Sequence, residues 1–190
     1  MMFKRFLSLV LVLCCLAGCL PLPAGAEEPP GLPISGTCGD NLTWTLDEGG
    51  TLTISGTGDM TDYNSSAPWA TIQGSIKAIV IEEGVTSIGS SAFLGSQHLK
   101  QVALPNSIAT IADGAFGYCS ELTSIEIPKQ VKKIGKGAFI HCGELTNVNI
   151  PDSVTSLGSA AFLGCSSLLK LNYPGTCLRL QMKHLVGVHH

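Results

Sequence analysis

The chain of 190 residues has few charged side chains and, over most of its first half, no basic ones. Charged residues make up 13% of the sequence, and no Lys or Arg occurs between Arg5 and Lys77. With so few charges and with 22 glycines, long solvent-exposed helices are not expected. After residue 26 no apolar run is long enough to cross a bilayer as a helix. The length allows one ordinary domain or a short array of repeats.

Residues 1–26 have the layout of a secretory signal peptide. A short basic start precedes the apolar segment Phe6–Leu16, and residues 24–26 (AGA) form a small-residue cleavage site. Cleavage after Ala26 leaves nine basic residues against 14 acidic ones, a net charge of −5. This charge does not indicate a nucleic-acid or an anionic-membrane partner.

A second cleavage site competes with the first. Residues 16–19 (LAGC) resemble a bacterial lipobox, in which Cys19 would become the lipid-modified N-terminus of a lipoprotein. We expect cleavage after Ala26, because an apolar stretch rather than a polar tether follows Cys19. Both alternatives predict an exported protein, either secreted or held at the cell surface.

Residues 27–34 form a Pro-rich linker, and residues 35–75 are expected to form a small β-hairpin module. Alternating apolar residues at 42–46 and 52–54 flank the turn sequence DEGG, which predicts a hairpin. Pro68 and Trp69 should pack onto the next part of the chain. Asp59, Asp62 and Asn64 could suggest calcium, but they lack the spacing of an EF-hand loop and are expected in Asx turns.

From residue 76 onward the sequence repeats every 23 residues without a gap. The full units span 76–98, 99–121, 122–144 and 145–167, and a fifth begins at Leu168. Apolar residues at the fourth and sixth positions, such as Ile79 and Ile81, have the period of a short strand. Proline ends that strand in most units, and an Ala-Phe pair recurs later in each full unit.

One such unit cannot bury its apolar face alone, whereas stacked units cover one another. The sequence therefore predicts a repeat solenoid of leucine-rich-repeat type, with a short-stranded parallel β-sheet, preceded by the hairpin module. The recurring phenylalanines should form an internal column: Phe93, Phe116, Phe139 and Phe162. The repeats should extend over 76–174, and residues 175–190 should form an irregular C-terminal end, either a cap or the point where a longer protein is truncated.

The pattern L-x-x-I-x-I-P-x-x-V-x-x-I-G-x-x-A-F-x-x-C-x-x resembles the bacterial surface leucine-rich repeats of the BspA type. The segment from Ser35 to Gly74 resembles the hairpin-rich module that often precedes them. The resemblance implies an exported protein that binds extracellular or cell-surface proteins, often in adhesion, and that has no catalytic residues and no cofactor. The alternative is an accessory repeat region of a larger secreted enzyme or surface protein.

His141 and Cys142 stand side by side and could suggest a catalytic dyad, but the repeat explains both. Cys142 aligns with Cys119, Cys165 and Ser96, as expected of a small residue that faces inward. His141 aligns with Gly95, Tyr118 and Gly164, so we expect an exposed position that accepts any residue. The cysteines lack zinc-site spacing. Disulfides are an alternative for an exported chain, but residues 27–190 contain five cysteines, and we expect the aligned three to be free and buried.

The expected partner-binding face consists of the third and fifth positions of each unit, which point away from the core. It is rich in amides and has no aromatic residue, so it disfavours sugars and predicts modest affinity for proteins. Its candidate residues are Gln101, Ser124, Glu126, Asn147, Asn149, Lys170 and Asn172. A separate cluster in the third unit, Lys129, Lys132, Lys133 and Lys136, is expected to be a solvated surface; the alternative is attraction to an acidic polymer or to a neighbour's Lys-free module.

Overall fold

The computed structural model describes residues 34–64 and 66–172. The expected signal peptide, the lipobox cysteine Cys19, residues 27–33 of the linker and the C-terminal segment 175–190 lie outside these residues, and so does Cys177. Among the described residues no helix is long and apolar enough to cross a membrane.

The N-terminal module is an antiparallel meander of three strands, β1 (Ile34–Gly39), β2 (Leu42–Leu46) and β3 (Thr51–Gly56). The alternation of buried and exposed residues along β2 is complete, as the sequence predicts for this strand. The turn to β3 is held by Asp47, whose carboxylate accepts the backbone N–H of Thr51 at 2.8 Å. The predicted hairpin is confirmed, and β1 adds a third strand to it.

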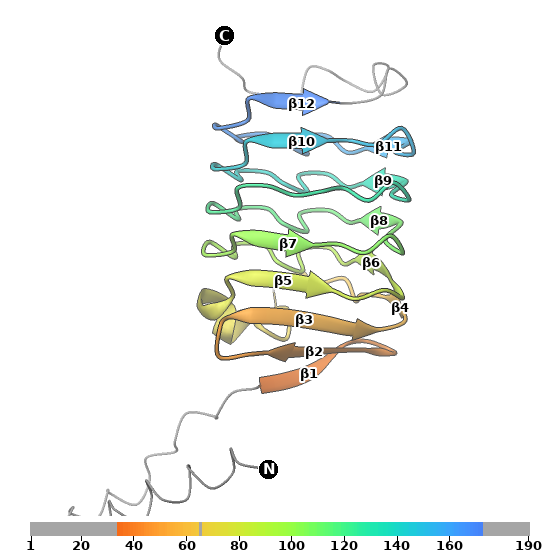
Figure 1. Ribbon diagram of the computed structural model, residues 1–190, viewed down its shortest axis with the longest axis vertical. Helices are drawn as coiled ribbons and strands as arrows, with labels where there is room; N and C mark the ends of the chain where they lie inside the picture. The colour runs from red at the N-terminus through yellow and green to blue at the C-terminus, as the bar shows by residue number, and fades with distance from the viewer. Residues whose placement is uncertain (1–33, 65, 173–190) are drawn as a thin grey trace, which may run out of the picture. The chain divides into compact units, whose positions relative to one another are not determined.

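The meander continues directly into the solenoid, because β3 pairs in parallel with the first repeat strand (Figure 1). Ile54 lies opposite Ile81, so the buried face of the meander is continuous with the core of the repeats. The first sheet has the order β1-β2-β3-β5-β7, and a separate pair, β10-β12, extends the same side of the coil in later units. The strands on this side are β5 (Ala78–Ile81), β7 (Gln101–Ala103), β10 (Asn147–Asn149) and β12 (Lys170–Asn172).

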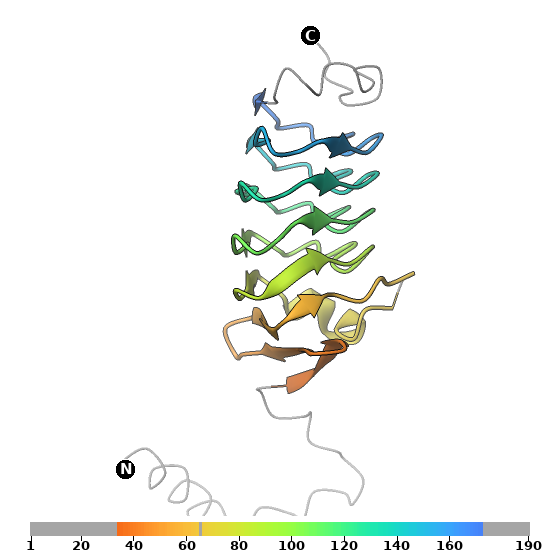
Figure 2. The ribbon, with the colours of Figure 1, turned by 90° about the vertical axis from the view of Figure 1, so that its right-hand side faces the viewer.

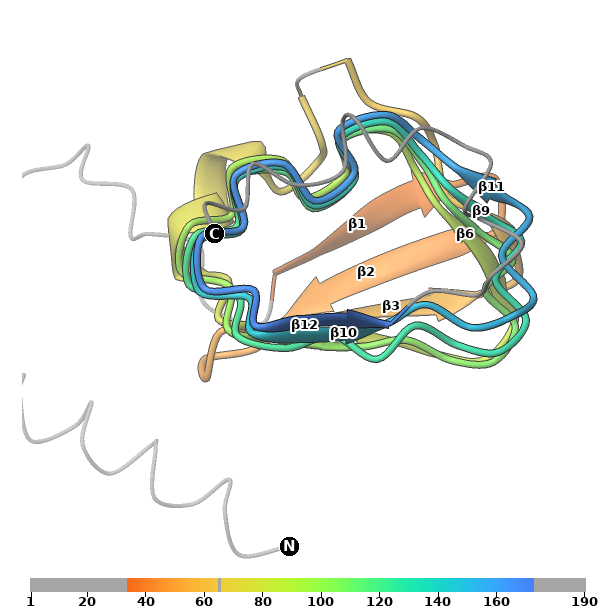
Figure 3. The same cartoon turned by 90° about the horizontal axis from the view of Figure 1, so that it is seen from above.

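A second parallel sheet forms another side of the coil, with one short strand from each turn (Figure 2). Its strands are β4 (Gly58–Asp59), β6 (Val85–Ile88), β8 (Thr110–Ile111), β9 (Lys133–Ile134) and β11 (Ser156–Leu157). Between repeat units, paired residues in both sheets are 23 residues apart, as for Ser87 and Thr110 or Asn147 and Lys170. The gapless repeat therefore sets the register of the ladder. Seen from above, the coils superpose around one core, with the short 3-10 helix η1 (Ala70–Ser75) at a corner (Figure 3).

The predicted phenylalanine column is confirmed. Consecutive rings from Phe93 to Phe162 are stacked with centroids 5.3, 5.6 and 5.2 Å apart. Each of the four side chains is fully buried. Trp69 stacks on Phe93 at 5.1 Å and so continues the column into the N-terminal part of the fold.

The third unit departs from the expected strand pattern. Ile125 and Ile127 are buried as predicted, at 5% and 4% exposure, but residues 125–127 belong to no strand. Among the described residues its link to the neighbouring strands is a single bridge between Ser124 and Asn147. Core packing therefore keeps the two isoleucines inward even where strand pairing is reduced to this bridge.

Candidate binding face and groove

The seven residues of the predicted partner-binding face are all exposed. Strand register places them in two rows along the coil axis. Asn147 lies opposite Lys170 in one row, and Asn149 lies opposite Asn172 in the other. The bridge to Ser124 extends the first row by one more unit.

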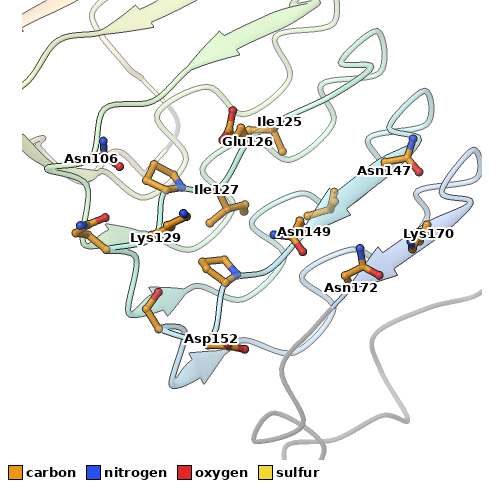
Figure 4. Close-up of a pocket in the computed structure, with 15 residues that line it drawn as sticks. Asn106, Ile125, Glu126, Ile127, Lys129, Asn147, Asn149, Asp152, Lys170 and Asn172 are labelled. Carbon is orange, nitrogen blue, oxygen red and sulfur yellow. The ribbon is translucent and has the colours of Figure 1, made fainter.

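A groove of about 1110 Å³ opens on this face where the third unit leaves the ladder (Figure 4). It runs from the strand face around the corner that comes after each strand. Buried apolar residues, including Ile125, Ile127 and Val148, contribute to its wall. Its rim is polar, and the groove brings together five of the predicted residues: Glu126, Asn147, Asn149, Lys170 and Asn172.

The other two predicted residues lie apart from this groove. Gln101 and Ser124 border a smaller depression of about 370 Å³ over the first three units, together with small apolar residues such as Ala78 and Ala103. Glu126 contributes to both depressions. The face thus changes along the solenoid, from small and apolar in the first units to amide-rich and charged in the last.

Strand periodicity alone misses the part of the rim that comes after each strand. These residues occupy the two positions after the strand-ending proline of units two to four: Asn106, Lys129, Gln130, Asp152 and Ser153. The polar pair that follows the proline in each of these units could have predicted this part of the rim from the sequence. The strand positions predict a flat face, whereas the groove also includes the corner beside it.

The chemistry of the groove is that of amides with balanced charge. Five amide side chains line it, and each offers both a hydrogen-bond donor and an acceptor. Two lysines, Lys129 and Lys170, stand against two acids, Glu126 and Asp152. With no excess of either sign, the groove does not select a polyanion or a polycation.

The lysine cluster of the third unit is exposed and carries no ion pair with any described residue. Lys129 lies at the groove, whereas Lys133 borders a depression along the second sheet. The ion pairs in the described part of the chain are those of Glu121 with His98 and Lys100. The hydrogen bond from His98 and the nearby Lys100 lower the pKa of Glu121.

The cysteines of the repeat are buried and free, as expected, and so is Cys38. Each repeat thiol donates to the carbonyl of the preceding unit's phenylalanine, as in the bond from Cys142 to Phe116 at 3.1 Å. Burial raises the pKa of Cys38 to about 11, and burial together with the neighbouring Cys142 raises the pKa of Cys165 to about 12. Thiols held in this way are poor nucleophiles at neutral pH.

His141 is exposed while Cys142 is buried, so the two side chains diverge and form no dyad. The expectation that position 141 accepts any residue is wrong. Its φ is 56°, and the aligned Tyr118 has φ 59°, whereas the other two units have Gly95 and Gly164 at φ 76°. This left-handed conformation favours glycine and disfavours other residues by about 1–2 kcal/mol.

The acidic residues considered for calcium bind the neighbouring coil instead. Asp59 accepts a hydrogen bond from the Thr86 hydroxyl at 2.6 Å, and Asp62 accepts the backbone N–H of Ser90 at 2.6 Å. Over residues 34–64 and 66–172 no group of three or more His, Cys, Asp or Glu side chains is placed to hold a metal ion.

Three solved structures share this fold. A leucine-rich repeat protein from Eubacterium ventriosum is 24% identical over 77% of this chain and 45% of its own, with a TM-score of 0.61. One from Bacteroides ovatus is 28% identical over 71% and 40%, with a TM-score of 0.53. A leucine rich cell surface protein from Faecalibacterium prausnitzii is 23% identical over 73% and 39%, with a TM-score of 0.57. The chain spans less than half of each of these proteins.

No curated protein matches the chain. The profile of the BspA type leucine rich repeat region matches residues 71–185 with six copies, and so extends beyond the predicted 76–174. This match covers more than half of the sequence. The chain belongs to the BspA-type leucine-rich repeat family.

Proposed function

We propose that the chain is an exported bacterial binding protein that takes protein partners at the cell surface, in adhesion, through the groove of its strand face. The observation that supports this most is the groove of about 1110 Å³, which gathers five amide side chains around an opening in the ladder. The N-terminal sequence supports export. The proposed role is non-catalytic.

The groove suits an extended segment of a partner protein. A peptide main chain is itself a row of amides, and side-chain amides can donate to its carbonyls and accept from its N–H groups. The rows of Asn149 with Asn172 and of Asn147 with Lys170 repeat along the coil axis at the spacing of strands, about 4.8 Å. The groove has no tryptophan, tyrosine or arginine, so we expect modest affinity that increases when several copies bind together.

The test measures binding of the purified chain to a panel of extracellular-matrix and cell-surface proteins by surface plasmon resonance. In the variant that combines Asn147→Ala and Asn149→Ala, the Kd for any captured partner should rise about tenfold, because two hydrogen-bonding side chains are lost at about 0.5–1.5 kcal/mol each. The matched control is Asn41→Ala, an exposed amide in the turn between β1 and β2.

The control should bind as the parent does. A panel with no binder, or a partner that binds the double variant and the parent equally, would show that the groove is not the recognition site.

A further inference from the structure

A second exposed feature lies at the corner of the coil that turns back toward the strand face, away from the groove. The rings of Tyr118 and His141 are stacked there with centroids 4.9 Å apart and planes 29° apart. Tyr118 is 50% exposed, more than any Phe, Trp or other Tyr among the described residues. The equivalent residues of the first and fourth units are Gly95 and Gly164, so the stack of two rings has a glycine on either side of it.

Tyr118 and His141 both adopt a left-handed backbone conformation, which favours glycine. The two sister units use glycine at the same position, so the fold itself does not require a ring there. A non-glycine residue with positive φ is uncommon, and this chain also has Ser91 and Ala160 in that conformation. Tyr118 and His141 therefore present their rings at a position where glycine would be less strained.

One face of this ring ladder is open. The ring of His141 lies over Gly164, where an added Cβ would collide with the imidazole. Each ring thus leans over the next unit, and Tyr118 leans toward His141. At Gly95 an added Cβ would meet within 4 Å only the side-chain nitrogen of Gln73, at 3.7 Å. The Tyr118 face that points toward Gly95 therefore has no ring stacked upon it.

The space next to Gly95 is bordered by polar and apolar groups. Gln73, from η1 at this corner (Figure 3), donates to the carbonyl of Leu94 at 2.5 Å and to the hydroxyl of Ser96 at 3.1 Å. A small recess of about 60 Å³ between η1 and the first unit includes Gln73, Ser91 and Leu94. Leu94 is itself 37% exposed.

We propose that this corner is a carbohydrate site, in which a pyranose ring stacks on the open face of Tyr118 and occupies the position that Gly95 leaves free. The C–H face of a sugar ring is apolar and flat enough to lie on an aromatic face, while its hydroxyls reach outward to amides and water. The ring spacing of 4.9 Å within the Tyr118–His141 stack is that of one coil, so a sugar one coil earlier continues the ladder.

The same criterion separates this corner from the groove. The groove has no aromatic side chain and does not favour sugars, whereas the corner has an exposed aromatic face with an amide beside it. His141 acts as a support, because it holds the opposite face of Tyr118 and fixes the angle of the ring. The site is independent of the protein-binding role proposed above.

The experiment uses the purified full chain and three probes: methyl β-galactopyranoside, methyl β-glucopyranoside and methyl β-N-acetylglucosaminide. Saturation-transfer NMR at millimolar concentration should show contact between the protein and the ring protons of at least one sugar. Tyr118→Gly should abolish that signal while leaving the chain as stable as the parent or more so, because glycine removes the left-handed strain. Gly95→His, which places a ring where the sugar would lie, should also abolish it.

Ala160→Gly is the matched control, since it relieves a left-handed residue of the fourth unit without removing a ring. This control and the groove variant that combines Asn147→Ala with Asn149→Ala should keep the full sugar signal. His141→Gly should weaken the signal but not remove it. No signal with any of the three sugars, an undiminished signal in Tyr118→Gly, or a signal lost equally in Ala160→Gly would overturn the proposal.

Discussion

Removal of a ring from the middle of the phenylalanine column should be among the most destabilising changes in this fold. Phe139 is fully buried, and its ring stacks on Phe116 at 5.6 Å and on Phe162 at 5.2 Å. Burial of the side chain contributes roughly 2–3 kcal/mol, and each aromatic pair adds about 0.5–1.5 kcal/mol. Phe139→Ala should therefore lower the free energy of unfolding by about 3–5 kcal/mol.

The coils on either side cannot close over the resulting cavity. The backbone N–H of Phe139 donates to Ala161 in the next coil at 2.8 Å, and that of Phe116 donates to Ala138 at 2.8 Å. These bonds hold the spacing between coils whether or not the ring is present. The cost should accordingly lie toward the upper part of the range.

Guanidinium unfolding, followed by circular dichroism and by tryptophan fluorescence, measures this effect. Phe162→Ala is the matched comparison, because among the described residues its ring stacks on Phe139 alone, and it should cost about 1 kcal/mol less. Repeat proteins can unfold in parts, so both probes and the slope of the transition must agree before a free energy is calculated. A Phe139→Ala variant as stable as the parent would refute the buried column.

Three further outcomes are expected. Ala160→Gly should raise the free energy of unfolding by about 1 kcal/mol, since residue 160 has φ 58°; thermal unfolding measures this, and a lower Tm would contradict it. Iodoacetamide at neutral pH should label Cys142 slowly in the folded chain and rapidly in denaturant, with Cys119 and Cys165 alike; rapid native labelling of Cys142 alone would reopen a reactive site. Folding raises the pKa of Cys38 from 9.0 to about 11 and that of Cys165 to about 12, because burial favours the protonated thiol. The stability that these protonated thiols contribute is complete below pH 9 and is lost as the pH rises from about 9 to 12. Unfolding curves at alkaline pH should show this decrease in the free energy of unfolding.

The repeat makes most of the fold predictable. A gapless period of 23 residues leaves one register for the ladder, so the observed pairings agree with the alignment of the units. The same alignment identifies the phenylalanine column and assigns Cys142 to an inward position, although its neighbour His141 could suggest a catalytic pair. The repeat period is enough to predict these features because each coil packs only against its neighbours.

Backbone conformation is harder to predict. Glycine occupies the left-handed position in two units, while Tyr118 and His141 occupy it in the others, so composition at that position suggests tolerance rather than constraint. A second repeat position is also left-handed in all four units. It is Gly114 and Gly137 in the middle units but Ser91 and Ala160 in the outer ones, so its composition does not reveal the conformation either. A short sequence shows which residues are accepted but not the φ that each must adopt.

The groove is not predictable from strand periodicity, because it depends on a strand that does not form. At the ninth position of their units, Ser107 and Ser153 donate to carbonyls of the preceding coil, Val85 and Val131, at 2.7 Å in both cases. The third unit has Gln130 there, and no hydrogen bond joins its side chain to a described residue of the coil before it. The hydrogen bond that this serine makes between coils in the second and fourth units is thus missing in the third unit, next to the groove.

This difference predicts that Gln130→Ser closes the groove in part. A serine at 130 can donate to the carbonyl of Ile108, which corresponds to Val85 and Val131, and the new bond should raise the free energy of unfolding by about 0.5–1.5 kcal/mol. The same change removes an amide from the rim, so affinity for a groove-bound partner should fall while the sugar signal at Tyr118 stays constant. Chemical unfolding and surface plasmon resonance measure the two effects. If the variant is less stable than the parent, the missing serine does not explain why the third unit leaves the ladder.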